Sequence, residues 1–445
     1  MPSSTSSETP SSATIPPKRS VTSLRDRSAI VRGEPNRVRG RLPNDSIRPP
    51  RRARIASPAV DFRDDAEQEA FRAELRAWFV EMLPTELRDH PGGAAHFADD
   101  TLRAWSRTLH EAGYAGLSWP VEHGGRGLAP SYQAILFEEE ARAGAPGHIG
   151  VIGLGMAGPT IMTHGTDAQK ERHLARILSA EEIWCQGFSE PGAGSDLAAV
   201  RTSARLEGDR YIVHGQKVWS SYAHVADFCI LLTRSDPGSE GHAGLTYFIL
   251  DMHAQGVEVR PLRQLTGEAE FNEIFLDGAE IAVENVLGTP GRGWEVAMTT
   301  LLHERGTLGF AFVGRLDAQV RRLLGLARDR GATPAQRERI AAEWIEVQGL
   351  RFTAGRSLAA LERTGIPGPE GSILKLRWSE ANQRVTALAL ELLGPDGGLA
   401  GARAPYAGVW PHEQLRSRGN TIEAGTSEIL RSIVAERVLG LPRSR

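Results

Sequence analysis

A carboxylate within an apolar helical stripe is the group in this sequence best suited to proton transfer. Ala297, Leu301 and Leu308 lie at offsets of −7, −3 and +4 from Glu304, which places all four on one face of a predicted helix. Burying a carboxylate there is costly unless it is paired or functional, and desolvation raises the pKa of such a group toward the range of a general base. The spacing therefore predicts either a base at Glu304 or a buried ion pair with Arg305.

A glycine-rich run at residues 189–196 (SEPGAGSD) is suited to holding a bound group. Its small residues permit close backbone approach and turns with positive φ. Two other segments carry useful side chains: residues 216–221 (QKVWSS) end a predicted strand, and residues 422–429 (IEAGTSEI) combine a glycine with hydroxyl and carboxyl groups. Taken alone, the first run could be a turn entering a sheet, and Trp219 could be a core residue at a strand end.

These three segments, together with residues 301–306 (LLHERG), occur in an order and at distances that resemble the acyl-CoA dehydrogenase family. The resemblance covers roughly residues 60 to 441. Members of this family are flavoenzymes that desaturate acyl thioesters between the α and β carbons. That reaction needs a base for the α proton, donors for the charge on the thioester oxygen, and a hydride acceptor. No side chain accepts hydride, so the resemblance implies bound FAD.

The resemblance also implies roles for individual residues. Ser189, Trp219, Ser221, Thr426 and Glu428 match positions that contact the flavin, and Ser195 and Arg305 match positions that contact the acyl-CoA. No metal-ligand spacing is present, so no metal site is expected.

Two glutamates compete for the role of base. Many family members place the catalytic Glu immediately before the Gly-Thr of the late segment, but here Ala424 occupies that position and Glu423 lies one place too early. Other members place it on an earlier helix, immediately before an Arg, which Glu304 matches. The resemblance and the apolar stripe both favour Glu304, with Glu423 as the runner-up.

The chain departs from the family at positions that concern contacts between subunits. An Arg-x-x-Phe-Gly segment is not apparent near residues 321–339, and a frequent Gln is replaced by Glu391 before a Gly-rich loop at residues 394–398. A homodimer, a homotetramer or a heteromer with a related chain is therefore expected. The resemblance further implies an electron-transfer flavoprotein as electron acceptor.

The charge of the chain is unevenly distributed. Residues 1–57 contain 12 Lys and Arg against 4 Asp and Glu, a net charge of +8. The whole chain has a net charge of −3, so residues 58–445 carry −11. This Ser-, Pro- and Arg-rich tail cannot bury enough apolar surface to fold, and we expect it to be disordered. It could be a plain extension, a targeting segment or a basic arm for nucleic acid or an acidic partner. Without an apolar run of 18 residues or a secretory signal, a cytoplasmic protein with no membrane span is expected. Cys185 and Cys229 suit a reducing compartment as buried packing residues.

Hydrophobic spacing predicts an α, β, α order and a mainly helical α+β fold. We expect a helical domain at residues 58–183, whose first helix has an apolar stripe that includes Phe71, Leu75 and Phe79. A small β-barrel or sandwich is expected at 184–290, with strands at 200–206, 211–219, 228–234, 245–250, 257–262 and 271–276. A helical bundle is expected at 291–441, with helices at 294–313, 316–328, 335–363, 372–393 and 426–438. Residues 153–158 match the dinucleotide fingerprint G-x-G-x-x-G, but helical surroundings favour close backbone packing instead. Two other functions stay open at this point: a flavin oxidase or hydroxylase of the same fold, and a non-catalytic relative that binds DNA through its tail.

Overall fold

The computed structural model describes residues 62–88, 99–365, 367–401 and 403–443, without the side chains of 305–308. The tail predicted to be disordered, residues 1–57, lies outside these ranges. Within them, no helix combines the length and apolar character needed to span a bilayer.

The first part of the described chain is helical, as predicted. Its helices are α1 (Ala66–Met82), α2 (Asp99–Glu111), α3 (Pro130–Ala143), α4 (Gly158–His164) and α5 (Asp167–Leu178). Capping boxes begin α1 at Asp65 and α5 at Thr166. The predicted apolar stripe of α1, Phe71, Leu75 and Phe79, is buried against α2 and α3.

The fingerprint-like run at residues 153–158 is helical rather than a strand followed by a turn. Residues Gly153–Ala157 form a π-helical turn that continues into α4. A Cβ added at Gly158 would lie 2.2 Å from a ring atom of Trp119, and one at Gly153 would lie 2.9 Å from Ile177. The glycines therefore permit close packing, as expected.

The middle of the chain forms one curled sheet. Its strands are β1 (Trp184–Gly187), β2 (Ser203–Glu207), β3 (Arg210–Ser221), β4 (Phe228–Arg234), β5 (Leu245–Asp251), β6 (Val257–Leu262) and β7 (Phe271–Ala282). The order is β1-β4-β2-β3-β7-β6, with β5 paired to β4. The short strand β1 was not predicted, and β7 continues past its predicted end at Leu276. Cys185 and Cys229 are buried packing residues that form no disulfide.

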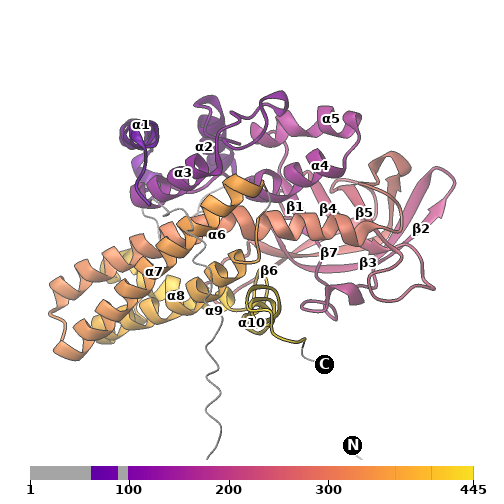
Figure 1. The fold of residues 1–445 in the computed structure, drawn as a ribbon. Helices are drawn as coiled ribbons and strands as arrows, with labels where there is room; N and C mark the ends of the chain where they lie inside the picture. The colour runs from indigo at the N-terminus through magenta and orange to yellow at the C-terminus, as the bar shows by residue number, and fades with distance from the viewer. Residues whose placement is uncertain (1–61, 89–98, 366, 402, 444–445) are drawn as a thin grey trace, which may run out of the picture. The chain divides into compact units, whose positions relative to one another are not determined.

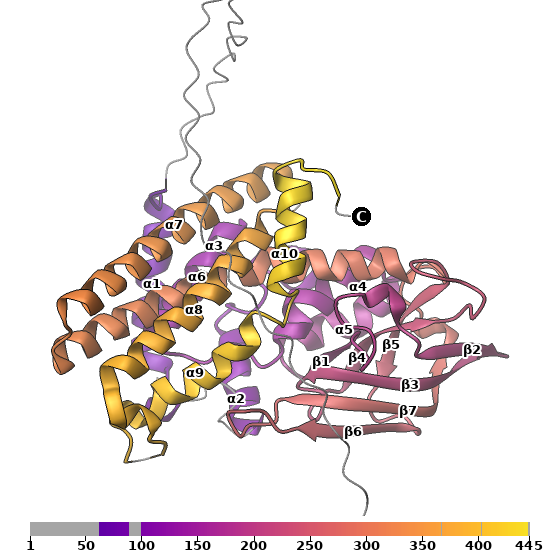
Figure 2. The ribbon, with the colours of Figure 1, turned by 90° about the horizontal axis from the view of Figure 1, so that it is seen from below.

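The last part of the described chain is a helical bundle, visible in Figures 1 and 2. Its helices are α6 (Gly293–Arg330), α7 (Pro334–Thr364), α8 (Gly371–Leu393), α9 (Val409–Asn420) and α10 (Ser427–Ile433). The prediction of two helices at residues 294–313 and 316–328 is wrong, because α6 is one continuous helix of 38 residues. Gly314 lies within this helix and allows α3 to pack closely against it, since a Cβ there would lie 3.3 Å from Cα of Glu138 on α3. Helix α9 was not predicted.

Helix α6 joins the sheet to the bundle. Near its start, Val296 and Ala297 are buried in the core that contains Tyr247 of β5. From Phe310 onward, its buried side chains belong to the bundle core. Residues 302–309 therefore lie where one core gives way to the other.

Candidate active site

Glu304 lies at this changeover on α6, and its side chain is half-buried. Its charge acts on Lys375 of α8, as does that of Glu423 in the late loop. Burial lowers the pKa of Lys375 to about 8, and the two carboxylates only partly oppose that effect. The two candidate bases therefore flank one buried lysine. The side chain of Arg305 lies outside the described atoms, so its role stays a prediction.

The late loop holds Glu423 in an ion pair. Arg416 of α9 donates to its two carboxylate oxygens over 3.3 and 3.0 Å, and Asn420 Nδ2 donates over 2.7 Å. Ala424 and Gly425 then turn the chain with φ of 51° and 95°. The Glu423 carboxylate is thus held in place by Arg416.

Thr426 and Glu428 begin α10 just beyond this turn. The Thr426 hydroxyl accepts a hydrogen bond from the Ile429 amide over 3.3 Å and caps the helix. Glu428 is exposed in the first turn. Lys375 Nζ donates to the carbonyl oxygen of Gly425 over 2.7 Å, which fastens the loop to α8.

The glycine-rich run is held by a buried ion pair that sequence reasoning missed. Lys217 of β3 is fully buried, and its Nζ donates to Glu190 Oε1 over 2.8 Å and to the Phe188 carbonyl over 3.0 Å. Glu190 also accepts from the amides of Arg201 and Thr202 over 2.7 and 2.9 Å. Lys217 follows the inward-facing Tyr211 and Val213 at even spacing on β3, a pattern that could have revealed it.

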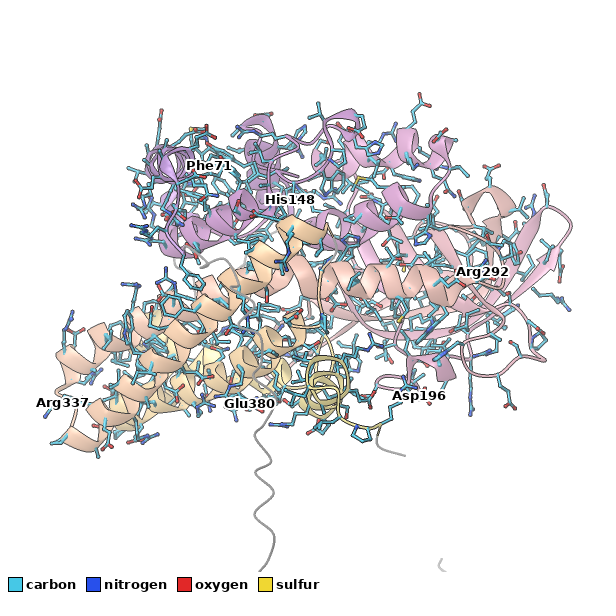
Figure 3. The ribbon with its side chains drawn as sticks, in the orientation of Figure 1. Phe71, His148, Asp196, Arg292, Arg337 and Glu380 are labelled. Atoms are coloured by element: carbon cyan, nitrogen blue, oxygen red, sulfur yellow. The ribbon has the colours of Figure 1, made fainter. Side chains whose placement is uncertain are left out.

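Ser189, Ser195 and Asp196 occupy different environments within this run. The Ser189 carbonyl accepts from the Val218 amide over 2.9 Å, so the run begins beside the end of β3. Ser195 and Asp196 are exposed, and Asp196 is labelled in Figure 3. No contact joins Ser195 to the other predicted site residues within the described part of the chain.

Trp219 presents an uncovered aromatic ring at the end of β3. Its φ is 63°, its side chain is 61% exposed, and it sits at an irregularity in the β3–β7 pairing. The ring meets Phe271 edge-on at 6.1 Å, and Ser221 pairs with Phe271 in register. An exposed Trp held in a strained conformation is a flat platform, which fits a planar cofactor ring.

Arg416 links this platform to the late loop. Besides Glu423, it contacts Glu270 at 3.4 Å, and its guanidinium lies 5.6 Å from the centre of the Phe271 ring. Burial raises the pKa of Glu270, with Arg416 opposing. The structure thus brings the late loop, the end of β3 and α6 into one region.

A cavity of about 750 Å³ opens in this region. His303, Arg416 and Glu423 line it, together with side chains of α3, α8 and the loop after β3. Neither Glu304 nor any residue predicted to contact the flavin is among the lining residues. A cavity of this size suits a small-molecule ligand group.

A helical N-terminal part, a curled middle sheet and a C-terminal helical bundle form the architecture expected of an acyl-CoA dehydrogenase. The chain belongs to the acyl-CoA dehydrogenase family, and the resemblance seen in the sequence is confirmed. Its N-terminal, middle and C-terminal domain descriptions match residues 65–181, 185–279 and 291–439. The mainly helical α+β fold class and the oxidoreductase class are confirmed with it.

Individual proteins that are similar to this chain include one relative in sequence and two solved structures. The chain is 42% identical over 390 residues to the acyl-CoA dehydrogenase IpdE1 of Mycobacterium tuberculosis, covering 84% of this chain and 98% of that one. Among solved structures, it resembles the Tcur3481-Tcur3483 steroid ACAD with a TM-score of 0.78 and 31% identity, over 86% of this chain and all of the other. It also resembles the ChsE4-ChsE5 complex from M. tuberculosis, with a TM-score of 0.77 and 28% identity, over 86% of this chain and all of the other.

Proposed function

We propose that this protein is an FAD-dependent dehydrogenase that introduces an α,β double bond into an acyl-CoA thioester, with Glu304 as the base. The observation that carries the assignment is the different position of the two candidates. Glu423 is bound by Arg416 and Asn420, whereas Glu304 stands on α6 at the junction of the two cores, next to a lining residue of the cavity.

Each part of the reaction is assigned to particular residues. The Glu304 carboxylate accepts the α proton as the general base. A backbone amide of the late loop, fixed by Lys375, donates to the thioester oxygen. FAD, when bound, supplies the hydride acceptor. Ser195 and Arg305 are proposed to bind the acyl-CoA.

The residues proposed to hold FAD fit a flat ring with polar edges. Trp219 offers an uncovered aromatic face, and Ser220 and Ser221 follow it directly in β3. The proposed set is Ser189, Trp219, Ser221, Thr426 and Glu428. The pair Lys217–Glu190 supports this set by fixing the run in which Ser189 lies.

We further propose a heteromer with a related chain, with homodimer and homotetramer as alternatives. The two solved relatives described above, Tcur3481-Tcur3483 and ChsE4-ChsE5, each have names that join two proteins. Glu391, where a Gln is frequent in the family, bonds Arg339 and Gln336 within this chain. Size-exclusion chromatography with flavin quantification tests this: one FAD per chain in a tetramer of this chain alone rules out the heteromer.

We also propose an electron-transfer flavoprotein as the electron acceptor and a cytoplasmic location. The proposed domain boundaries are residues 58–183, 184–290 and 291–441. The test of the whole is anaerobic. A panel of acyl-CoA thioesters is added to the purified yellow protein, or to its complex with the related chain, and bleaching of the flavin is followed. Bleaching by at least one thioester is expected, and a folded protein or complex that takes up no flavin contradicts the proposal.

A further inference from the structure

A carboxyl group, a guanidinium and a phenol on the cavity wall form no side-chain hydrogen bond or ion pair within the described part of the chain. They are Glu140 of α3, Arg315 of α6 and Tyr222 after β3. Glu140 is only 8% exposed, and burial raises its pKa to about 7, with Arg315 opposing. Burial likewise raises the pKa of Tyr222 to about 12, so its hydroxyl stays protonated at neutral pH.

The guanidinium and the carboxyl group lie close together. A Cβ placed on Gly147 would be 3.8 Å from Glu140 Oε2 and 3.9 Å from Arg315 Nη2. Both side chains stand on helices that cross closely, since a Cβ on Gly314 would lie 3.4 Å from the Phe137 carbonyl oxygen. Their relative position is therefore fixed by the packing of α3 on α6.

Other charged groups on the cavity wall already have partners. Glu268 bonds His412 at 3.0 Å, Glu413 bonds Gln319 at 2.9 Å, and Glu423 bonds Arg416. His148, labelled in Figure 3, accepts from the Gly150 amide at 2.9 Å, and burial lowers the pKa of His148 to about 4, which keeps it neutral. Glu140, Arg315 and Tyr222 thus differ from these carboxylates in having no side-chain partner, although single atoms of Glu268, Glu270, His148 and His412 also lack one.

Helix geometry places these groups at a defined distance from the base. Arg315 follows Glu304 by eleven positions on α6. At 100° and 1.5 Å per residue, the two Cα atoms lie on the same helical face, offset by about 20° and roughly 16 Å apart along the axis. Ala311 and Phe312, between them, line the cavity. An acyl chain that starts at Glu304 and follows this face reaches Arg315 after several carbons.

We propose that Arg315, Tyr222 and Glu140 bind an oxygen function carried by the acyl group far from the thioester, so that the substrates are oxygenated acyl-CoAs rather than plain fatty acyl-CoAs. This rests on the proposed function. Arg315 and Tyr222 are donors, and protonated Glu140 is a third, so the site suits an acceptor oxygen of a ketone or a carboxylate. A plain alkyl end would desolvate these groups and give them no partner.

The test measures binding without turnover. CoA thioethers bearing octyl, 7-oxooctyl and 7-carboxyheptyl groups are titrated into the flavin-loaded protein by calorimetry. We expect one or both oxygenated compounds to bind roughly 10- to 100-fold more tightly than the octyl compound. The compound that gains identifies the function as a ketone or a carboxylate. Equal or tighter binding of the octyl compound overturns the inference.

Variants keep the test specific. Arg315→Met should abolish the preference while leaving octyl binding within about 2-fold, and Tyr222→Phe should reduce it partly. Arg328→Met, an exposed arginine on the same helix outside the cavity, is the matched control and should retain it. A preference that survives both Arg315→Met and Tyr222→Phe contradicts the assignment. Failure of every corresponding thioester to bleach the flavin, with the binding preference intact, contradicts the proposed function instead.

Discussion

Lys375 donates a hydrogen bond of 2.7 Å from its Nζ to the carbonyl oxygen of Gly425. The lysine is 2% exposed on α8, and burial lowers its pKa to about 8. Because Glu423 and Glu304 both act on it electrostatically, one buried ammonium joins the bundle, the late loop and the proposed base. The position of the late loop therefore depends on a residue that no sequence motif contains.

Lys375→Met removes this donor and leaves the Gly425 carbonyl without it. We expect weaker flavin binding and a late loop that exchanges its amide protons faster. The folded pKa of Lys375 lies below the ordinary value of 10.5, so the unfolded chain binds more protons between pH 8 and 10.5. The free energy of unfolding of the wild type should therefore rise relative to that of the variant over this window, by about 1–3 kcal/mol.

Urea unfolding at pH 7, 9 and 10.5 measures this difference. Lys170→Met on α5 is the control, because Lys170 is paired loosely with an exposed Asp167 at 3.8 Å. A wild type and a Lys375→Met protein whose stabilities change in parallel with pH would contradict the role given to Lys375.

Glu304→Gln keeps the size of the side chain and removes its basicity. We expect the rate of flavin reduction to fall by about 10²- to 10⁴-fold, with flavin content unchanged. Glu423→Gln is the matched variant, and its rate should stay within about 10-fold of the wild type, since Glu423 serves Arg416. Anaerobic stopped-flow reduction by acyl-CoA compares them. Loss of turnover in Glu423→Gln alone would move the base to Glu423.

Glu190→Gln tests the support of the glycine-rich run. The change leaves the Lys217 ammonium buried without its counter-ion, so a loss of about 3–5 kcal/mol in the free energy of unfolding is expected, with loss of flavin. The double variant Glu190→Gln with Lys217→Met should lose less, because no uncompensated charge remains. Denaturant curves and flavin absorbance measure both, and equal losses in the single and double variants would contradict the ion-pair explanation.

The same ion pair predicts a pH dependence. Burial alone would raise the pKa of Glu190, but Lys217 and the donors around the carboxylate bring it below 4.5. This pair therefore contributes stability that is complete above the unfolded pKa and is lost as the pH falls below it. The wild type should lose stability relative to Glu190→Gln on acidification below about pH 4.5.

Local patterns in the sequence predicted most of the helices and strands. The apolar spacing of Phe71, Leu75 and Phe79 and the alternation along β3 are short-range signals, which one segment carries by itself. Gly314 misled the prediction because a glycine within a helix can serve either a break or a close helix crossing. Only the position of α3, far earlier in the chain, decides between the two.

The candidate site was predictable only in part for the same reason. Motifs located the run at residues 189–196, Trp219 and both glutamates. The contacts that position them join distant segments: Lys217 with Glu190, Lys375 with Gly425, and Arg416 with Glu270. The alternation along β3 indicates that Lys217 is buried. The partners in these pairs depend on the packed arrangement of β3, α8 and α9, which no periodicity in a single sequence reports.

Arg416→Met tests whether the ion pair with Arg416 holds the Glu423 carboxylate in place. Arg416 is shared by Glu423 and Glu270, so its removal takes the common guanidinium from both carboxylates. The side chains of Arg416 and Glu423 are 28% and 29% exposed, so we expect a loss of about 1–3 kcal/mol, less than for a fully buried pair. Arg418→Met, an exposed neighbour on α9, is the control and should cost under about 0.5 kcal/mol. If both variants unfold at the same urea concentration, the ion pair does not hold Glu423, and the structural reason for preferring Glu304 as the base is lost.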